Sequence, residues 1–66
     1  MKVEQPHGVL GNWILDAEGY IHGQVFGDTK GRFANGEQIT TSRVSRIERI
    51  NGLAIAVTKY SRYVLA

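Results

Sequence analysis

The stretch RIERI-NG-LAIAVT, residues 46–58, decides the fold. An Asn-Gly pair between two runs rich in apolar and β-branched residues is the strongest short-range signal for a β-hairpin. We therefore expect residues 46–50 and 53–58 to form two antiparallel strands joined by a tight turn.

The segment just before this hairpin is ambiguous. In SRVSRIERI, the apolar residues Val44, Ile47 and Ile50 recur at every third position, which fits a helical or 3₁₀ turn after a Thr/Ser cap. The hairpin signal favours a strand over residues 46–50 and leaves residues 42–45 as a tight connecting turn. The sequence leaves open whether residues 42–47 form a turn, a helix or a strand.

A second hairpin is indicated over residues 12–26. The run YIHGQVF alternates strictly, with Ile21, Gly23 and Val25 on one face, and a period of two is typical of a strand. Gly23 inside it suggests a bulge or a place where another backbone comes close. The preceding run NWILD ends at AEG, which is a turn signal.

Two shorter strands, EQITT and RYVLA, complete the pattern, and residues 1–11 are expected to form an arm or an irregular lead-in strand. The 66 residues are expected to form a single small β domain. A twisted sheet of five to six short strands tends to curl and remove its exposed edges. The predicted fold is therefore all-β, a small antiparallel SH3-like or otherwise partly open barrel with at most one 3₁₀ or helical turn.

Length and composition limit what else the chain can be. There is no cysteine, so disulfides and Cys-based metal sites are excluded, and two histidines are too few for a structural zinc site within one chain. Small domains without such staples often oligomerise, so we expect a homo-oligomer. Neither a signal peptide nor a membrane-spanning apolar run is visible, which predicts a cytoplasmic protein with no membrane partner.

Charge is distributed unevenly along the chain. Residues 1–29 carry one base against four acids, whereas residues 30–66 carry seven bases against two acids, which gives net charges of −3 and +5. Such asymmetry indicates an anionic partner, for which nucleic acid or a nucleotide are the candidates.

The segment GDTKGRFANGEQITTS, residues 27–42, first suggests a phosphate-binding loop. It lacks the Gly-Lys-Ser/Thr ending of a P-loop, and its glycines are better explained as turn residues that hold Lys30, Arg32 and Phe33 at a loop tip. Further bases are interleaved with tyrosine towards the end of the chain, as single-stranded nucleic acid or a nucleotide requires. The predicted ligand-binding residues are Lys30, Arg32, Phe33, Arg43, Arg46, Arg49, Lys59, Tyr60 and Arg62.

Catalysis is poorly supported. His7 falls in the expected arm, and His22 falls in a strand with no obvious acid partner, so no Ser-His-Asp arrangement can be argued. A domain of this size also has little room for a deep pocket within one subunit. We therefore expect no enzymatic activity, no cofactor and no metal, and we expect Trp13 to lie in the core or at an interface.

Two segments, ITTSRVSRI and AVTKYSRYVL, carry a resemblance to a known group of proteins. Their shared pattern consists of Ile39, Thr41, Ser42, Val44, Ile47, Val57, Thr58, Ser61, Tyr63 and Leu65. It resembles small bacterial and phage-encoded SH3-like β proteins of no settled function. The resemblance implies the fold and an origin in a mobile element, but no particular chemistry.

These observations predict a non-enzymatic binding protein that self-associates and presents a basic, tyrosine-bearing surface to an anionic partner. The alternative is a phage- or prophage-encoded inhibitor or adaptor that acts on a host protein, with Trp13, Phe26 and Phe33 as contact residues. A third possibility is an assembly component whose function is oligomerisation itself.

Overall fold

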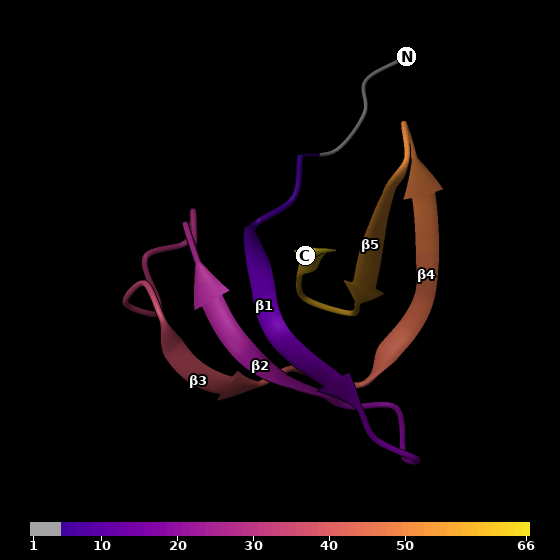
Figure 1. The fold of residues 1–66 in the computed structure, drawn as a ribbon, viewed down its shortest axis with the longest axis horizontal. Helices are drawn as coiled ribbons and strands as arrows, with labels where there is room; N and C mark the ends of the chain where they lie inside the picture. The colour runs from indigo at the N-terminus through magenta and orange to yellow at the C-terminus, as the bar shows by residue number, and fades with distance from the viewer. Residues whose placement is uncertain (1–4) are drawn as a thin grey trace.

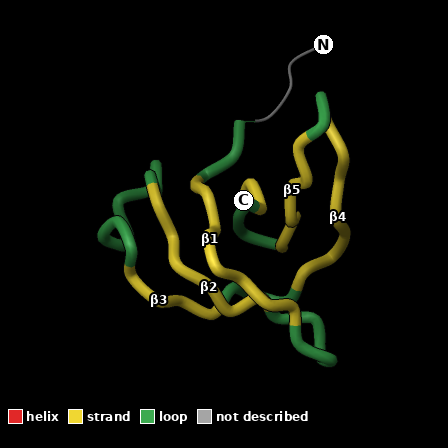
Figure 2. The backbone as a smooth tube through the Cα atoms, in the orientation of Figure 1, coloured by secondary structure: helices red, strands yellow, loops and turns green. Residues whose placement is uncertain are grey.

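The computed structural model describes residues 5–66, which form six β-strands in one curved sheet and contain no helix (Figures 1 and 2). The order across the sheet is β3-β2-β1-β6-β5-β4. The strands are β1 (Gly8–Leu15), β2 (Ile21–Phe26), β3 (Glu37–Thr40), β4 (Val44–Ile50), β5 (Leu53–Thr58) and β6 (Arg62–Leu65). The all-β prediction is confirmed. Among the described residues, no helix is long and apolar enough to cross a membrane.

The hairpin around Asn51-Gly52 is confirmed. Both turn residues have positive φ angles, 51° and 80°, as a two-residue hairpin turn of type I′ requires. β4 begins at Val44 and pairs with β5 as far as Ile50 opposite Leu53. Residues 44–47 of the ambiguous segment are therefore strand and not a helical turn, and the expected connecting turn over residues 42–45 is shorter, because residues 44 and 45 belong to β4. The pairing register shifts between Val44 and Arg46, which marks a β-bulge.

The second hairpin joins β1 and β2. β1 begins at Gly8, so residues 8–11 of the expected arm or lead-in belong to a strand, while residues 1–4 lie outside the described part. A Cβ atom added to Gly23 would lie 3.0 Å from Cβ of Trp13 and 3.1 Å from the carbonyl oxygen of Gly11. The close approach predicted at Gly23 is therefore confirmed.

The sheet is mixed, which corrects the expectation of a purely antiparallel one. β1 pairs with β6 in parallel, with Gly8 opposite Tyr63 and Leu10 opposite Leu65, whereas the other four pairings are antiparallel. Alternation along the sequence identifies strands and their faces, but it carries no information about which distant strand is the neighbour. The first and last strands of the chain therefore could not be paired in advance.

The sheet is also open, so the expected barrel is not closed. β3 and β4 are the two edges, and among residues 5–66 no ladder pairs them. Only residues 41–43 connect the end of β3 to the start of β4. Beside this connection, the backbone N–H of Thr41 donates to the carbonyl of Ile21 (2.9 Å), and the backbone N–H of Val44 donates to the carbonyl of Gly19 (2.8 Å). The edges therefore approach each other at one end and separate towards the other (Figure 1).

The core lies on the side of the sheet that the curl encloses. Leu10, Ile21 and Val25 are fully buried there. Trp13 packs against this cluster, as expected for a core residue, and its indole N–H donates to the carbonyl of Ala66 (2.9 Å). The remaining core residues are Ile39, Ala56 and Tyr63, with Phe33, Val44 and Leu65 packed against them.

Candidate functional site

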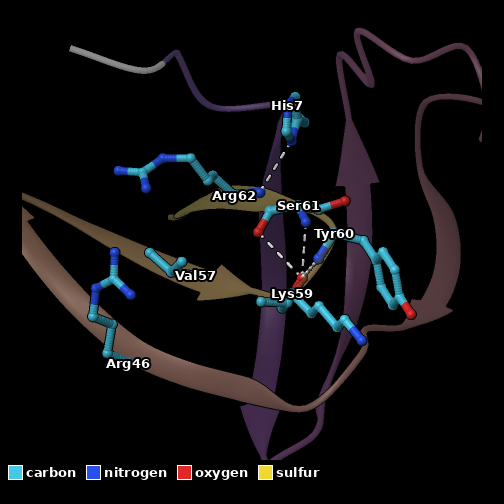
Figure 3. A pocket seen from close by; sticks show the side chains of 8 residues that line it. His7, Arg46, Val57, Lys59, Tyr60, Ser61 and Arg62 are labelled. Atoms are coloured by element: carbon cyan, nitrogen blue, oxygen red, sulfur yellow. Dashed lines mark hydrogen bonds between the residues drawn. The ribbon is translucent and has the colours of Figure 1, made fainter.

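A hollow of about 200 Å³, here called the first hollow, lies beside the turn between β5 and β6 (Figure 3). Thr58 shapes this turn, because its hydroxyl oxygen accepts the N–H groups of Tyr60 (3.2 Å) and Ser61 (2.9 Å). The lining residues are His7, Arg46, Val57, Thr58, Lys59, Tyr60, Ser61 and Arg62. Four of the predicted ligand-binding residues therefore meet at one place.

Arg62 is the most unusual residue of this hollow, because it is charged and only 9% exposed. One terminal nitrogen of its guanidinium donates to Glu48 (2.5 Å), while Nε has no hydrogen-bond partner among the described residues. Buried polar groups are normally satisfied, so an unpaired guanidinium N–H marks a place where a further acceptor would be stabilising.

Arg62 and Arg46 share the carboxylate of Glu48. Nε of Arg46 lies 2.9 Å from that carboxylate, and both guanidinium groups, Arg62 first, hold the pKa of Glu48 below its ordinary value. Two positive groups with one negative group between them leave a net positive charge at the first hollow.

His7 also belongs to the hollow, although no local sequence pattern indicated this position. The backbone N–H of His7 donates to the carbonyl of Arg62 (2.7 Å), and Nδ1 of His7 accepts the N–H of Arg62 (3.1 Å). The neutral ring therefore carries its proton on Nε2. This placement follows from the parallel pairing of β1 with β6, which joins the two ends of the chain.

The predicted basic, tyrosine-bearing surface is divided by the β5–β6 turn. Figure 3 shows the guanidinium groups of Arg46 and Arg62 on one side and the ammonium of Lys59 and the ring of Tyr60 on the other. Nζ of Lys59 lies 5.6 Å from the centroid of the Tyr60 ring, and Tyr60 is 61% exposed. Lys59 and Tyr60 therefore line the first hollow without directing their functional groups towards the two arginines.

Arg32 is bound to its own domain. Its guanidinium donates to Asp28 (3.1 Å), to the hydroxyl of Ser61 (3.1 Å) and to that of Tyr63 (3.0 Å). Asp28 also accepts the N–H groups of Arg32 (2.6 Å) and Phe33 (3.2 Å), and its side chain is fully covered. The guanidinium of Arg32 is the main cause that lowers the pKa of Asp28 to about 2, and Asp28 in turn raises the pKa of Arg32.

These contacts place the loop between β2 and β3 differently from the expected loop tip. Nζ of Lys30 donates to the carbonyl of Tyr60 (2.5 Å), and Phe33 packs against the core. The loop is therefore folded back onto the β5–β6 turn.

A second hollow of about 190 Å³ lies where the loop meets this turn, and most of its lining side chains carry a hydroxyl group. The lining residues are Arg32, Phe33, Ile39, Thr40, Thr41, Ser42, Thr58, Tyr60, Ser61 and Tyr63.

The two remaining predicted residues lie away from both hollows. The guanidinium of Arg43 stacks over the ring of Tyr20, 5.6 Å from its centroid. Arg49 is exposed on β4 opposite Ala54. Neither lines the first or the second hollow, so the structure does not gather the arginine series into one patch.

His22 does have an acid partner, contrary to the expectation from the sequence. Nε2 of His22 lies 2.8 Å from Oδ2 of Asp16, and Nδ1 lies 2.9 Å from the hydroxyl of Thr40. Asp16 also accepts the N–H groups of Glu18 and Tyr20, and its pKa is lowered, chiefly by the hydrogen bond with His22. A turn carboxylate six residues before a strand histidine is the signal that could have revealed this contact.

An acid, an imidazole and a hydroxyl in series resemble the arrangement of a hydrolase triad. In such enzymes the acid is buried, whereas the side chain of Asp16 is 29% exposed and closes the β1–β2 turn. These three side chains join that turn to β2 and β3. Within residues 5–66, no group of three or more His, Asp or Glu side chains is placed to hold a metal ion.

No protein-family model, curated protein or solved structure matches this chain. The resemblance to small bacterial and phage-encoded β proteins stays a prediction. The two hollows and the surface around them are therefore the features from which a function can be proposed.

Proposed function

We propose that this chain is a non-enzymatic, self-associating binding protein that holds an anionic group, the phosphate of a nucleic acid or a nucleotide, at the first hollow. The observation that carries the proposal is Arg62, a buried guanidinium with an unpaired Nε beside a second arginine. Charge-assisted hydrogen bonds from arginine to phosphate are among the strongest polar contacts in proteins.

Arg46 is the mobile partner in this proposal. Its side chain is 59% exposed and lies 2.9 Å from Glu48, so it can turn from the carboxylate to an incoming phosphate without leaving a buried charge behind. Exposed ion pairs of this kind contribute about 0–1 kcal/mol, so their exchange costs little. Arg62 would remain held by Glu48 and would contribute its positive charge beside the ligand.

A titration with labelled single-stranded oligonucleotides and with nucleotides, at low and at high salt, tests the proposal. We expect binding at low ionic strength that weakens as salt rises, because phosphate contacts release counterions. Arg46→Gln should weaken binding, whereas Arg43→Gln, with the same loss of charge outside the hollow, should bind like the parent protein. The absence of any binding at low salt would refute anion recognition, and equal losses in the two variants would refute this location.

A second candidate, a protein–protein inhibitor or adaptor of phage or prophage origin, is favoured by Phe26. Its ring is 41% exposed on the outer face of the sheet, opposite Val9, which is 37% exposed. Trp13 and Phe33 are less suited to contact a partner, since both pack against the core. A pull-down from a host lysate after nuclease treatment supports this alternative if Phe26→Asp abolishes the capture.

Several expectations about the whole protein stay predictions alongside this proposal. They are the cytoplasmic location, the homo-oligomeric state and the SH3-like relationship of the fold. The open sheet with adjacent β3 and β4 ends is the feature that bears most directly on the last of these.

A further inference from the structure

We infer that β4 is the surface through which two copies of this chain associate, by antiparallel pairing of β4 with β4 of the second copy, centred on Ile47. The inference rests on the self-association proposed above but not on anion binding. It starts from the observation that β4 has one neighbour, β5, so its other side is an edge among residues 5–66. An exposed edge strand is a ready template for another strand.

The hairpin turn fixes which backbone groups of β4 are free. Ile50 and Leu53 flank a two-residue turn and therefore exchange both of their backbone hydrogen bonds. Along an antiparallel ladder such pairs alternate, so Arg46 and Glu48 direct their N–H and C=O groups towards β5. The corresponding groups of Ile47 and Arg49 then point away from β5, towards the open side.

Side-chain charges favour one register among those centred on residues 46–49, the middle of β4. An axis at Arg46, Glu48 or Arg49 would place that charge directly opposite its own copy, which is destabilising. An axis at Ile47 places Ile47 opposite Ile47 of the second copy and Arg46 opposite Glu48, twice. The segment Arg46-Ile47-Glu48 is therefore complementary in charge to an antiparallel copy of itself.

Exposure agrees with this surface. Ile47 is 44% exposed although it belongs to the face of the sheet that carries Ala56 and Tyr63. Pairing through β4 would cover Ile47 and would satisfy the free backbone groups of Ile47. The other edge, β3, has four residues against seven in β4, and short edge strands are poor templates.

Ile47→Pro is the sharpest test, because the N–H that proline removes points away from β5. Proline is tolerated at such edge positions, so the fold should persist while the pairing between copies is blocked. Ile47→Thr is the matched control, since it retains the N–H and a β-branched side chain. Sedimentation velocity over a range of protein concentrations gives the mass, and far-ultraviolet circular dichroism reports the fold.

We expect the parent protein and Ile47→Thr to be dimeric and Ile47→Pro to be a folded monomer. A dimeric, folded Ile47→Pro would overturn this interface and leave self-association standing. A parent protein that is monomeric at every concentration would overturn both. Anion binding is titrated separately on the parent protein and on Ile47→Thr, which keep every lining side chain of the first hollow, so failure of the anion proposal is recognised independently.

A pair of charge reversals keeps the inference testable if Ile47→Pro does not fold. Arg46→Glu places a second carboxylate opposite Glu48 at both ends of the pairing and should raise the dimer dissociation constant about tenfold. Arg49→Glu changes the charge of the same strand equally, but its side chain lies opposite Ser45 and should leave the dimer intact. Equal effects of the two reversals, or no effect of either, contradict the Ile47-centred register.

Discussion

Replacement of Asp28 by asparagine should destabilise the fold at neutral pH and lose most of that effect in acid. The carboxylate accepts hydrogen bonds from the backbone of Arg32 and Phe33 and from the guanidinium of Arg32, and its side chain is fully covered. An amide at this position removes the negative charge and turns an N–H₂ group towards one of these donors.

The magnitude follows from the pKa of Asp28. In the folded state it is lowered from 3.8 to about 2, and a difference of nearly two pH units corresponds to about 2 kcal/mol. The guanidinium side of the pair is 34% exposed, so screening by solvent reduces this contribution, and we expect a loss of about 1–2 kcal/mol. For a domain of this size, that loss lowers the melting temperature by about 7–14 °C.

The pH dependence has a definite sign. Because the folded pKa lies below the unfolded pKa, the stabilisation is complete above the unfolded value of about 4 and disappears as the pH falls through about 2. Urea unfolding of the parent protein and Asp28→Asn at about pH 7, 4 and 2 measures this directly. The difference in free energy of unfolding should shrink towards the lowest pH.

Glu18→Gln provides the matched control, since it neutralises an exposed carboxylate in the β1–β2 turn. Its free energy of unfolding should stay close to that of the parent protein at each pH. The reasoning about Asp28 would be wrong if Asp28→Asn were as stable as the parent protein at neutral pH. It would also be wrong if the deficit were the same at pH 7 and pH 2.

Three further substitutions test the packing and the turns. Gly23→Ala should lower the free energy of unfolding by about 1–3 kcal/mol, because the added methyl would lie 3.0 Å from Cβ of Trp13. An unchanged urea midpoint of unfolding would contradict this close approach. Gly52→Ala should cost about 1 kcal/mol, because φ at this position is 80°, and a neutral or stabilising result would argue against the turn geometry. Tyr63→Phe should lower the free energy of unfolding by about 1 kcal/mol, because Arg32 loses the hydroxyl that accepts its hydrogen bond. An unchanged melting temperature in calorimetry would show that this hydrogen bond does not stabilise the loop.

Much of the fold could be predicted from local patterns. The Asn51-Gly52 turn and the alternation of residues 20–26 each identified a hairpin, because turn chemistry and side-chain period are properties of neighbouring residues. The close backbone approach at Gly23 was predicted for the same reason. The parallel pairing of β1 with β6 was not, because it joins residues at opposite ends of the chain.

The candidate site was less predictable than the fold. The sequence indicated the right kind of residue, and Arg46 and Arg62 do meet. Glu48 lies two residues after Arg46 on β4, whereas Arg62 and His7, which complete this environment, come from β6 and from the segment before β1. Arg32 was expected at an exposed loop tip, whereas Asp28 at the start of the same loop holds it inward. An aspartate that begins a glycine-rich loop was the available signal, since such residues hydrogen-bond to the backbone that follows them.

The position of β6 between β1 and β5 has a consequence for folding during synthesis on the ribosome. β6 is made after the other five strands, yet it fills the sheet between β1 and β5. Until residues 62–65 emerge, no strand joins the β1–β3 sheet to the β4–β5 hairpin. The nascent chain therefore carries two partial sheets whose facing edges lack their partner, and unpaired edges favour aggregation and chaperone binding. We expect the parallel pairing of β1 with β6 to be the last step of folding, because it needs the last strand of the described fold.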